Sequence, residues 1–270
     1  MISRDRVRFN NFGTKILLLS LFTLFGAVQS PKLQAEEVEG NNTIEEVSES
    51  EDTFIGEEVT VRGKVTDIEP GVSFVMEEEG LFEGDRVLVI NVSDNVLAVA
   101  ENEDLKLQVT GELGNLVIAD VERDYQLDLD PELYVEYENQ PVIFAESMVL
   151  SPDIEDVVEE PDTYYLQEIA LEGEVDEIRN DYTFTLKEDK LIDDDRLLMI
   201  NATGEPIPTE DDKVVVVGVV RPYVQAEFEK DYDLTWDLNV REEIEAEYTE
   251  KPVFVVESIY PSAEDDGLFE

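Results

Sequence analysis

The chain has 270 residues, of which 68 are acidic and 19 basic, for a formal net charge of −49 with 42% hydrophobic residues. That length and apolar content allow one large or two small folded domains and exclude a disordered acidic tail. Nucleic acid and anionic membrane surfaces are disfavoured partners, because phosphate binding needs clustered Lys and Arg. The chain has no Cys and no His, which excludes disulfides, thiolate and imidazole metal ligands, and nucleophiles activated by histidine.

Residues 1–35 are typical of a secretory signal, with a basic start, an apolar run from Ile16 to Val28 and a short polar stretch ending at Ala35. The 13-residue run is shorter than the roughly 20 residues of a membrane span. We therefore expect cleavage after Ala35, no stable membrane insertion, and a periplasmic or extracellular location. The alternative is an uncleaved N-terminal anchor. Residues 36–51 are polar and acidic and predict a flexible leader.

An internal duplication is the strongest pattern in the sequence. At an offset of 110 residues, fourteen of the forty positions from Asp52 to Asn91 are identical. The offset becomes 107 for a shared Asp-Tyr-x-Leu-x-x-Asp string and 111 for a shared Glu-Tyr-x-x-x-Pro-Val string. The sequence thus predicts module 1 (52–150), a linker (151–161), module 2 (162–262) and an acidic tail (263–270).

Each module alternates apolar and polar residues with a period of two, which predicts strands. In module 1 the expected strands are 58–68, with a central glycine, then 73–77, 86–92, 105–111 and 141–148. A loop or short helix is expected at 94–104, and an acidic insertion with helical turns precedes the fifth strand. Module 2 repeats this order at 168–178, 183–186, 196–201, 213–218 and 252–259.

Five strands with a glycine in the first, plus Val-x-Gly at the fourth, resemble the oligonucleotide/oligosaccharide-binding (OB) barrel. The expected fold class is therefore all-β with short helices, as two tandem five-stranded OB-like barrels, and small β-sandwiches are the alternative. The resemblance departs from the family in a binding face without basic residues and in a roughly 25-residue insertion between strands four and five. The whole chain is also similar to uncharacterised exported tandem-module proteins of cyanobacterial type.

Two kinds of residue are candidate ligand contacts. Arg is scarce, yet it recurs at the start of the third strand as Arg86 and Arg196, where it can hold an anionic or sugar ligand or pair with neighbouring carboxylates. Phe74 and Phe184 lie on the second strand, where barrels of this kind present stacking aromatics, although a buried Phe is the commoner case.

The acidic insertions are candidate cation sites, because calcium takes six to eight oxygen ligands. The alternative is a solvated acidic loop anchored by Tyr125 and Tyr232. No EF-hand string is present. The candidate carboxylates are Asp124, Asp128 and Asp130 in module 1 and Asp231, Asp233 and Asp237 in module 2.

No pair of carboxylates is singled out from the acidic background, so the sequence disfavours a glycosidase and predicts no catalytic residue and no cofactor other than calcium. The expected function is a non-enzymatic binding or structural protein of the cell envelope, with an envelope ligand or protein as partner. The runner-up is a low-affinity calcium-binding protein whose acidic insertions order when the cation binds. Single-stranded DNA binding ranks third.

Overall fold

The computed structural model describes residues 41–49, 54–78, 85–93, 105–188, 195–224, 238–249 and 251–263. They are mostly β-structure. The strands are β1 (Glu58–Glu69), β2 (Ser73–Glu77), β3 (Arg86–Asn91), β4 (Lys106–Asn115), β5 (Pro141–Leu150), β6 (Glu168–Asn180), β7 (Thr183–Lys187), β8 (Arg196–Asn201), β9 (Lys213–Pro222) and β10 (Pro252–Pro261).

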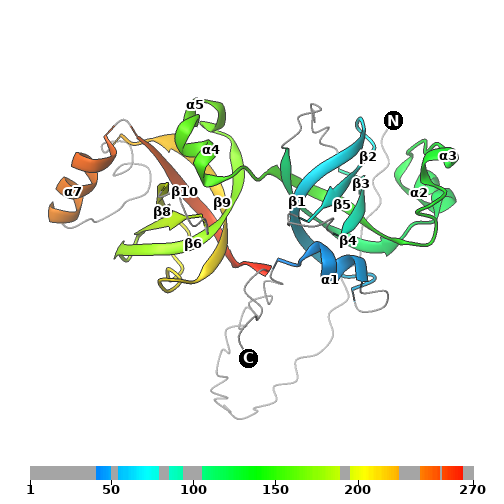
Figure 1. Cartoon of the computed structure of the whole chain (residues 1–270), viewed down its shortest axis with the longest axis horizontal. Helices are drawn as coiled ribbons and strands as arrows, with labels where there is room; N and C mark the ends of the chain where they lie inside the picture. The colour runs from blue at the N-terminus through cyan, green and yellow to red at the C-terminus, as the bar shows by residue number, and fades with distance from the viewer. Residues whose placement is uncertain are drawn as a thin grey trace, which may run out of the picture. The chain divides into compact units, whose positions relative to one another are not determined.

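The helices are short and lie before or between the strands (Figure 1). They are α1 (Ile44–Glu49), α2 (Ile118–Tyr125), α3 (Pro131–Tyr134), α4 (Ile154–Glu159), α5 (Pro161–Tyr164) and α7 (Leu238–Tyr248). Among the described residues, no helix has both the length and the apolar character needed to cross a membrane. The signal segment 1–35, the 94–104 segment and the last seven residues lie outside the described ranges.

Strands β1–β5 form a closed five-stranded barrel, which we call the N-terminal barrel. β1 pairs antiparallel with both β2 and β4, β2 pairs with β3, and β4 pairs with β5. Closure comes from the parallel pair β3–β5, in which Leu88 lies opposite Val142. Closure removes the exposed strand edges of an open sheet and excludes the sandwich alternative for this half of the chain.

Strands β6–β10, which we call the C-terminal sheet, follow the same order of pairings. β6 pairs antiparallel with β7 and with β9, β7 with β8, and β9 with β10. β8 and β10 are parallel, with Leu198 opposite Val253. The five strands expected from the sequence in each half are therefore present, and β4 and β9 run four residues further than expected.

Helix α1 corrects the expectation of a flexible leader at 36–51. Its Ile44 and Val47 are fully buried in the interior of the N-terminal barrel, among the inward-facing residues of β1 such as Val61. A backbone bridge between Asn42 and Val61 holds the start of the helix against β1. The helix therefore belongs to the barrel, because two large apolar side chains would otherwise be exposed to water.

Helix α4 corrects the linker expected at 151–161 in the same way. Ile154 and Val157 are fully buried in the core of the C-terminal sheet, beside Phe184. They follow Ile44 and Val47 at the offset of 110 residues. Each half thus begins with a helix that fills one end of its own core, and we call α1 and α4 the plug helices.

The insertion between β4 and β5 folds back on the outside of the N-terminal barrel, where α2 and α3 lie together (Figure 1). A second apolar cluster joins Val121 and Leu129 of the insertion to Leu88 of β3 and Val142 of β5. Tyr134 of α3 is buried there. Its hydroxyl shares a 2.8 Å hydrogen bond with Ser73 of β2, and burial raises its pKa. The outer faces of β2, β3 and β5 are therefore covered by the chain's own residues.

Helix α7 lies in the corresponding insertion between β9 and β10. Its Ile244 and Tyr248 pack on Leu198 of β8 and on Val253 of β10. The outer face of the parallel pair is thus covered in the C-terminal sheet as it is in the N-terminal barrel. The two halves cover this face with helices of different length and sequence.

Candidate functional site

Arg86 and Arg196 are both engaged in ion pairs. The Arg86 guanidinium binds Asp67 and lies 2.8 Å from Glu77 Oε1. Arg196 Nε lies 3.1 Å from Asp176 Oδ2, a carboxylate that Lys187 also approaches, at 3.5 Å. These contacts favour the alternative in which the two arginines offset local repulsion among carboxylates.

Phe74 and Phe184 are wrongly predicted as ligand contacts. Phe74 belongs to the interior cluster of the N-terminal barrel, and Phe184 is fully buried in the core of the C-terminal sheet. Alternation along β2 and β7 directs both rings inward, where a large apolar side chain gains most from burial. Neither ring has a face open to a base or a sugar.

Among the described residues, no trio of carboxylates comes together at the predicted calcium site in the first insertion. Asp124 is bound by the adjacent Arg123, whose Nε lies 2.8 Å from Asp124 Oδ1 and lowers the pKa of that carboxyl. Asp130 is the N-cap of α3 and accepts a 3.0 Å hydrogen bond from the backbone N–H of Glu132. Asp128 is exposed. Asp231, Asp233 and Asp237 lie outside the described residues.

Tyr125 lies on the surface of the insertion and not in the core. The residue is 43% exposed, and its ring stacks on Phe144 of β5 with the ring centroids 5.7 Å apart. It therefore anchors the end of α2 to the outside of the barrel. Tyr232, the other expected anchor, lies outside the described residues.

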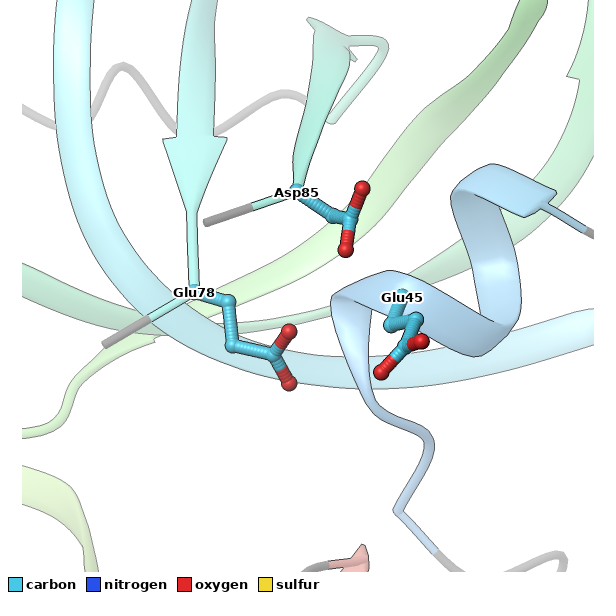
Figure 2. A group of neighbouring side chains, drawn as sticks. All are labelled: Glu45, Glu78 and Asp85. Atoms are coloured by element: carbon cyan, nitrogen blue, oxygen red, sulfur yellow. The ribbon is translucent and has the colours of Figure 1, made fainter. Parts of the chain in front are cut away.

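A different group of carboxylates meets where α1 passes the β2–β3 hairpin. Figure 2 shows Glu45 of α1, Glu78 directly after β2 and Asp85 directly before β3 with their carboxylates turned toward one another. One oxygen from each lies within 4.8 Å of the others. The hairpin is held by a 3.1 Å hydrogen bond from the Glu78 N–H to the Asp85 carbonyl.

Sequence reasoning missed this group because Glu45 falls in the expected leader. The available signal was the 110-residue offset, which continues upstream of Asp52 and matches Glu45 to Glu155. In the C-terminal sheet, Glu188 is the counterpart of Glu78 and has a different role. Its Oε1 accepts a 2.9 Å hydrogen bond from the backbone N–H of Glu155. The corresponding carboxylate thus satisfies a helix N-terminus there.

A small hollow of about 40 Å³ lies between the start of α1, β1 and the C-terminal sheet. It is far smaller than the roughly 300–1,000 Å³ of a typical small-molecule site and has room for about one water molecule. Its walls include Asn41, Arg62, Glu172 and Ala263. This hollow is not a substrate cleft.

No protein-family model matches the chain, and no curated protein matches its sequence.

Proposed function

We propose that the chain is an exported, non-enzymatic structural or binding protein of the cell envelope, built from two OB-like modules. The observation that carries the proposal is the covered outer face of the parallel strand pair in both halves. In OB barrels the face formed by strands two and three, with the adjoining loops, is the usual ligand surface. In the N-terminal barrel the insertion packs on Val75 of β2 and Leu88 of β3, and in the C-terminal sheet α7 packs on Leu198 of β8. Coverage of the third strand in both halves, and of the second strand in the N-terminal barrel, favours a scaffold over an oligonucleotide binder.

The proposal of two copies of one module is supported by the matching order of pairings in β1–β5 and β6–β10. It is also supported by the fourteen identities at the 110-residue offset and by plug helices that begin with Ile44 and Ile154. The residues that repeat include core positions, such as Phe74 and Phe184. Duplicated residues of this kind maintain a fold and do not constitute a catalytic site.

The pairing of cations with carboxylates supports the exclusion of nucleic acid. In the described part of the chain, Arg62, Arg86, Lys106, Arg123, Arg179, Lys187 and Arg196 all form ion pairs with carboxylates. Cations that are already paired release few counterions from a phosphate backbone. We therefore expect no sub-micromolar binding of single-stranded DNA at physiological salt.

Cell fractionation tests the location. The full chain and a variant without residues 2–35 would be expressed with the same C-terminal tag. We expect the full chain in the periplasmic or external fraction, shortened to begin at Glu36, and the truncated chain in the cytoplasm. Equal distribution of both chains would contradict export. Recovery of the full-length chain in the membrane fraction would favour the uncleaved anchor.

Low-affinity calcium binding is the second candidate, and the meeting of Glu45, Glu78 and Asp85 is the observation that favours it. Three carboxylates repel one another, so a divalent cation between them would stabilise the contact of α1 with the β2–β3 hairpin. A thermal melt of residues 36–270 in 0–10 mM calcium or magnesium tests this. We expect a saturable rise in Tm with calcium that is lost in E45Q/E78Q and kept in E122Q/E132Q, which alters two acids of the insertion.

A further inference from the structure

A network of charged and hydroxyl side chains joins the N-terminal barrel to the C-terminal sheet. Arg62 of β1 reaches Glu172 of β6, with Nη1 2.9 Å from Oε2. Its Nε donates a 2.7 Å hydrogen bond to Ser151 Oγ, and Ser151 in turn donates to the Ala170 carbonyl at 3.0 Å. Lys106 Nζ lies 2.6 Å from Asp153 Oδ1, which also approaches Arg62. We call these residues the junction.

The junction residues are more enclosed than the arginines of two other ion pairs, Arg86 and Arg123. The side chains of Lys106, Arg62 and Glu172 are 12%, 17% and 18% exposed, against 48% for Arg86 and 65% for Arg123. Partly buried pairs are screened less by salt and discriminate more sharply against a wrong charge than exposed pairs do. The junction also places two scarce cations against two carboxylates, in a chain with 68 acids.

Arg62 and Glu172 occupy the same position in the two halves. They are 110 residues apart, and within their halves each faces the corresponding position of the fourth strand: Arg62 lies opposite Gln108 and Glu172 opposite Val215. The contact is therefore made by one position meeting its own counterpart. Contacts of this kind characterise a two-fold interface between like units.

The hydroxyl partners follow the same relation. Ser151 comes directly after β5, and Ser262 directly after β10. The backbone N–H of Ser151 donates to Lys106 and that of Ser262 to Lys213, the first residues of β4 and β9. Ser151 bonds to Arg62, and Ser262 donates to Glu172. Each serine thus supports the charged residue on the first strand of its own half.

The chain ends continue this symmetry. At the end of β5, Leu150 is joined covalently to Ser151, which leads into plug helix α4. At the end of β10, the Pro261 carbonyl accepts a 3.1 Å hydrogen bond from Asn41 Nδ2, and Asn41 leads into plug helix α1. The Asn41–Pro261 hydrogen bond thus joins the last strand of the C-terminal sheet to α1, as the Leu150–Ser151 peptide bond joins the last strand of the N-terminal barrel to α4.

From this arrangement we infer that the charge difference between Arg62 and Glu172 selects pairing of unlike halves. If two N-terminal barrels met in this way, Arg62 would face Arg62, and two C-terminal sheets would bring Glu172 against Glu172. Only the unlike pair places a cation against a carboxylate at the shared position. The junction therefore favours the partner within the same chain over a second copy, by repulsion as well as attraction. The inference rests on the proposed equivalence of the two halves.

The test uses chemical crosslinking in the full mature chain, which has no cysteine of its own. Asn41→Cys and Pro261→Cys supply a pair of thiols across the junction, and a short bifunctional maleimide joins them. We call the variant with both cysteines the reporter chain. The rate at which it is crosslinked within one chain is followed on a denaturing gel, and the same rate is measured in reporter chains that also carry R62E or R62E/E172R. R86E is the matched control, because Arg86 pairs with Asp67 and Glu77 inside the N-terminal barrel.

We expect R62E to slow the crosslink at least about fivefold, since it places a third carboxylate against Glu172 and Asp153 in a partly buried site. The double reversal R62E/E172R should recover most of the rate, and R86E should leave it within about twofold of the parent, as expected for an exposed pair. Crosslinking of R62E at the parent rate, or a double variant as slow as R62E, would overturn the inference.

A neutral pair of variants keeps the test decisive if R62E does not fold, as judged by circular dichroism. R62Q leaves Glu172 without its cation, whereas R62Q/E172Q removes both charges. The inference requires R62Q/E172Q to crosslink faster than R62Q, and equal rates would overturn it. Export of the chain is scored separately, so failure here leaves the proposed location untouched.

Discussion

The Cδ1 atom of Ile44 lies 2.6 Å from the position that a Cβ atom on Gly63 would occupy. The same relation recurs in the C-terminal sheet, where Ile154 Cδ1 lies 2.9 Å from the corresponding position on Gly173. Each plug helix thus seats its isoleucine over the glycine of the first strand. A carbonyl oxygen of the second strand is equally close: that of Glu77 lies 2.7 Å from the Gly63 position, and that of Lys187 lies 2.5 Å from the Gly173 position. The repeated glycine is required because any side chain there would collide with both the isoleucine and this backbone oxygen.

Truncation of the plug isoleucines should destabilise the protein. We expect I44A and I154A each to lower the free energy of unfolding by about 2–4 kcal/mol, the usual cost of removing a fully buried aliphatic side chain. Urea denaturation of residues 36–270 measures the effect. L133A is the control, because Leu133 is 52% exposed and its truncation should cost less than about 0.5 kcal/mol. A flexible leader at 36–51 would predict no effect of I44A.

Alanine substitutions at three glycines should show that a Cβ crowded by backbone atoms costs more stability than one crowded by a side chain. A Cβ on Gly111 would lie 2.2 Å from the Phe144 carbonyl oxygen, and one on Gly63 2.7 Å from that of Glu77. On Gly114 its nearest neighbour, at 2.8 Å, is an atom of the partly exposed Phe144 ring. We expect G111A and G63A to cost about 3 kcal/mol or more and G114A about 1 kcal/mol. Thermal melts that rank G114A as the most damaging would contradict this.

The sequence predicted the strands well because both period-two alternation and the duplication mark them. The inward Val59 and Val61, for example, alternate with partly exposed residues such as Thr60. The plug helices were missed because their sequence is acidic and short, and the buried residues described in α1 are Ile44 and Val47. Burial of Ile44 depends on the barrel and not on the local sequence, so polarity alone favoured a leader.

The candidate site was less predictable than the fold. Alternation cannot show which face of β2 points inward, so Phe74 remained a candidate ligand contact beside the alternative that it is buried. Carboxylates such as Asp124 and Asp130 were grouped by nearness in the sequence, whereas the three that meet come from α1 and the two ends of a hairpin. Pairing of Arg62 with Glu172 depends on contact between the two halves, which no local pattern records.

Variants of Asp130 distinguish a helix-capping role for this residue from a calcium-binding role. As the N-cap of α3 it accepts the Glu132 N–H, so D130A should lower stability by about 1 kcal/mol while D130N should nearly retain it. Melts of both variants in calcium-free buffer check this. If Asp130 were instead a calcium ligand, D130A would match the parent without calcium and lose stabilisation only when calcium is added.

Glu247 should contribute a pH-dependent term to stability. The Arg179 guanidinium, which donates to both Glu247 oxygens and lies over the Tyr248 ring, lowers the pKa of this carboxyl below its ordinary 4.5. A lowered folded-state pKa gives stabilisation that is present above pH 4.5 and is lost as the pH falls through the lowered value.

E247Q should therefore melt below the parent at pH 7, by a small margin because Glu247 is 48% exposed. The two melting temperatures should converge as the pH falls below the lowered pKa of Glu247. E242Q, at an exposed position on the same helix, is the control. A difference in melting temperature that stays constant as the pH is lowered from 7 until the protein unfolds in acid would show that the ion pair does not stabilise the fold.

We propose above that the chain is one module used twice, with the two halves closed on each other at the junction. A circular permutant tests it most directly: residues 151–263, a five-residue Gly-Ser linker, then residues 41–150. Asn41 and Ala263 line one hollow, so the linker spans a short gap, and the new ends replace the Leu150–Ser151 bond. We predict a soluble monomer with a single cooperative melt within about 5 °C of the unpermuted 41–263 chain. A permutant that melts in two separate steps, or that folds only as a dimer, would contradict the account.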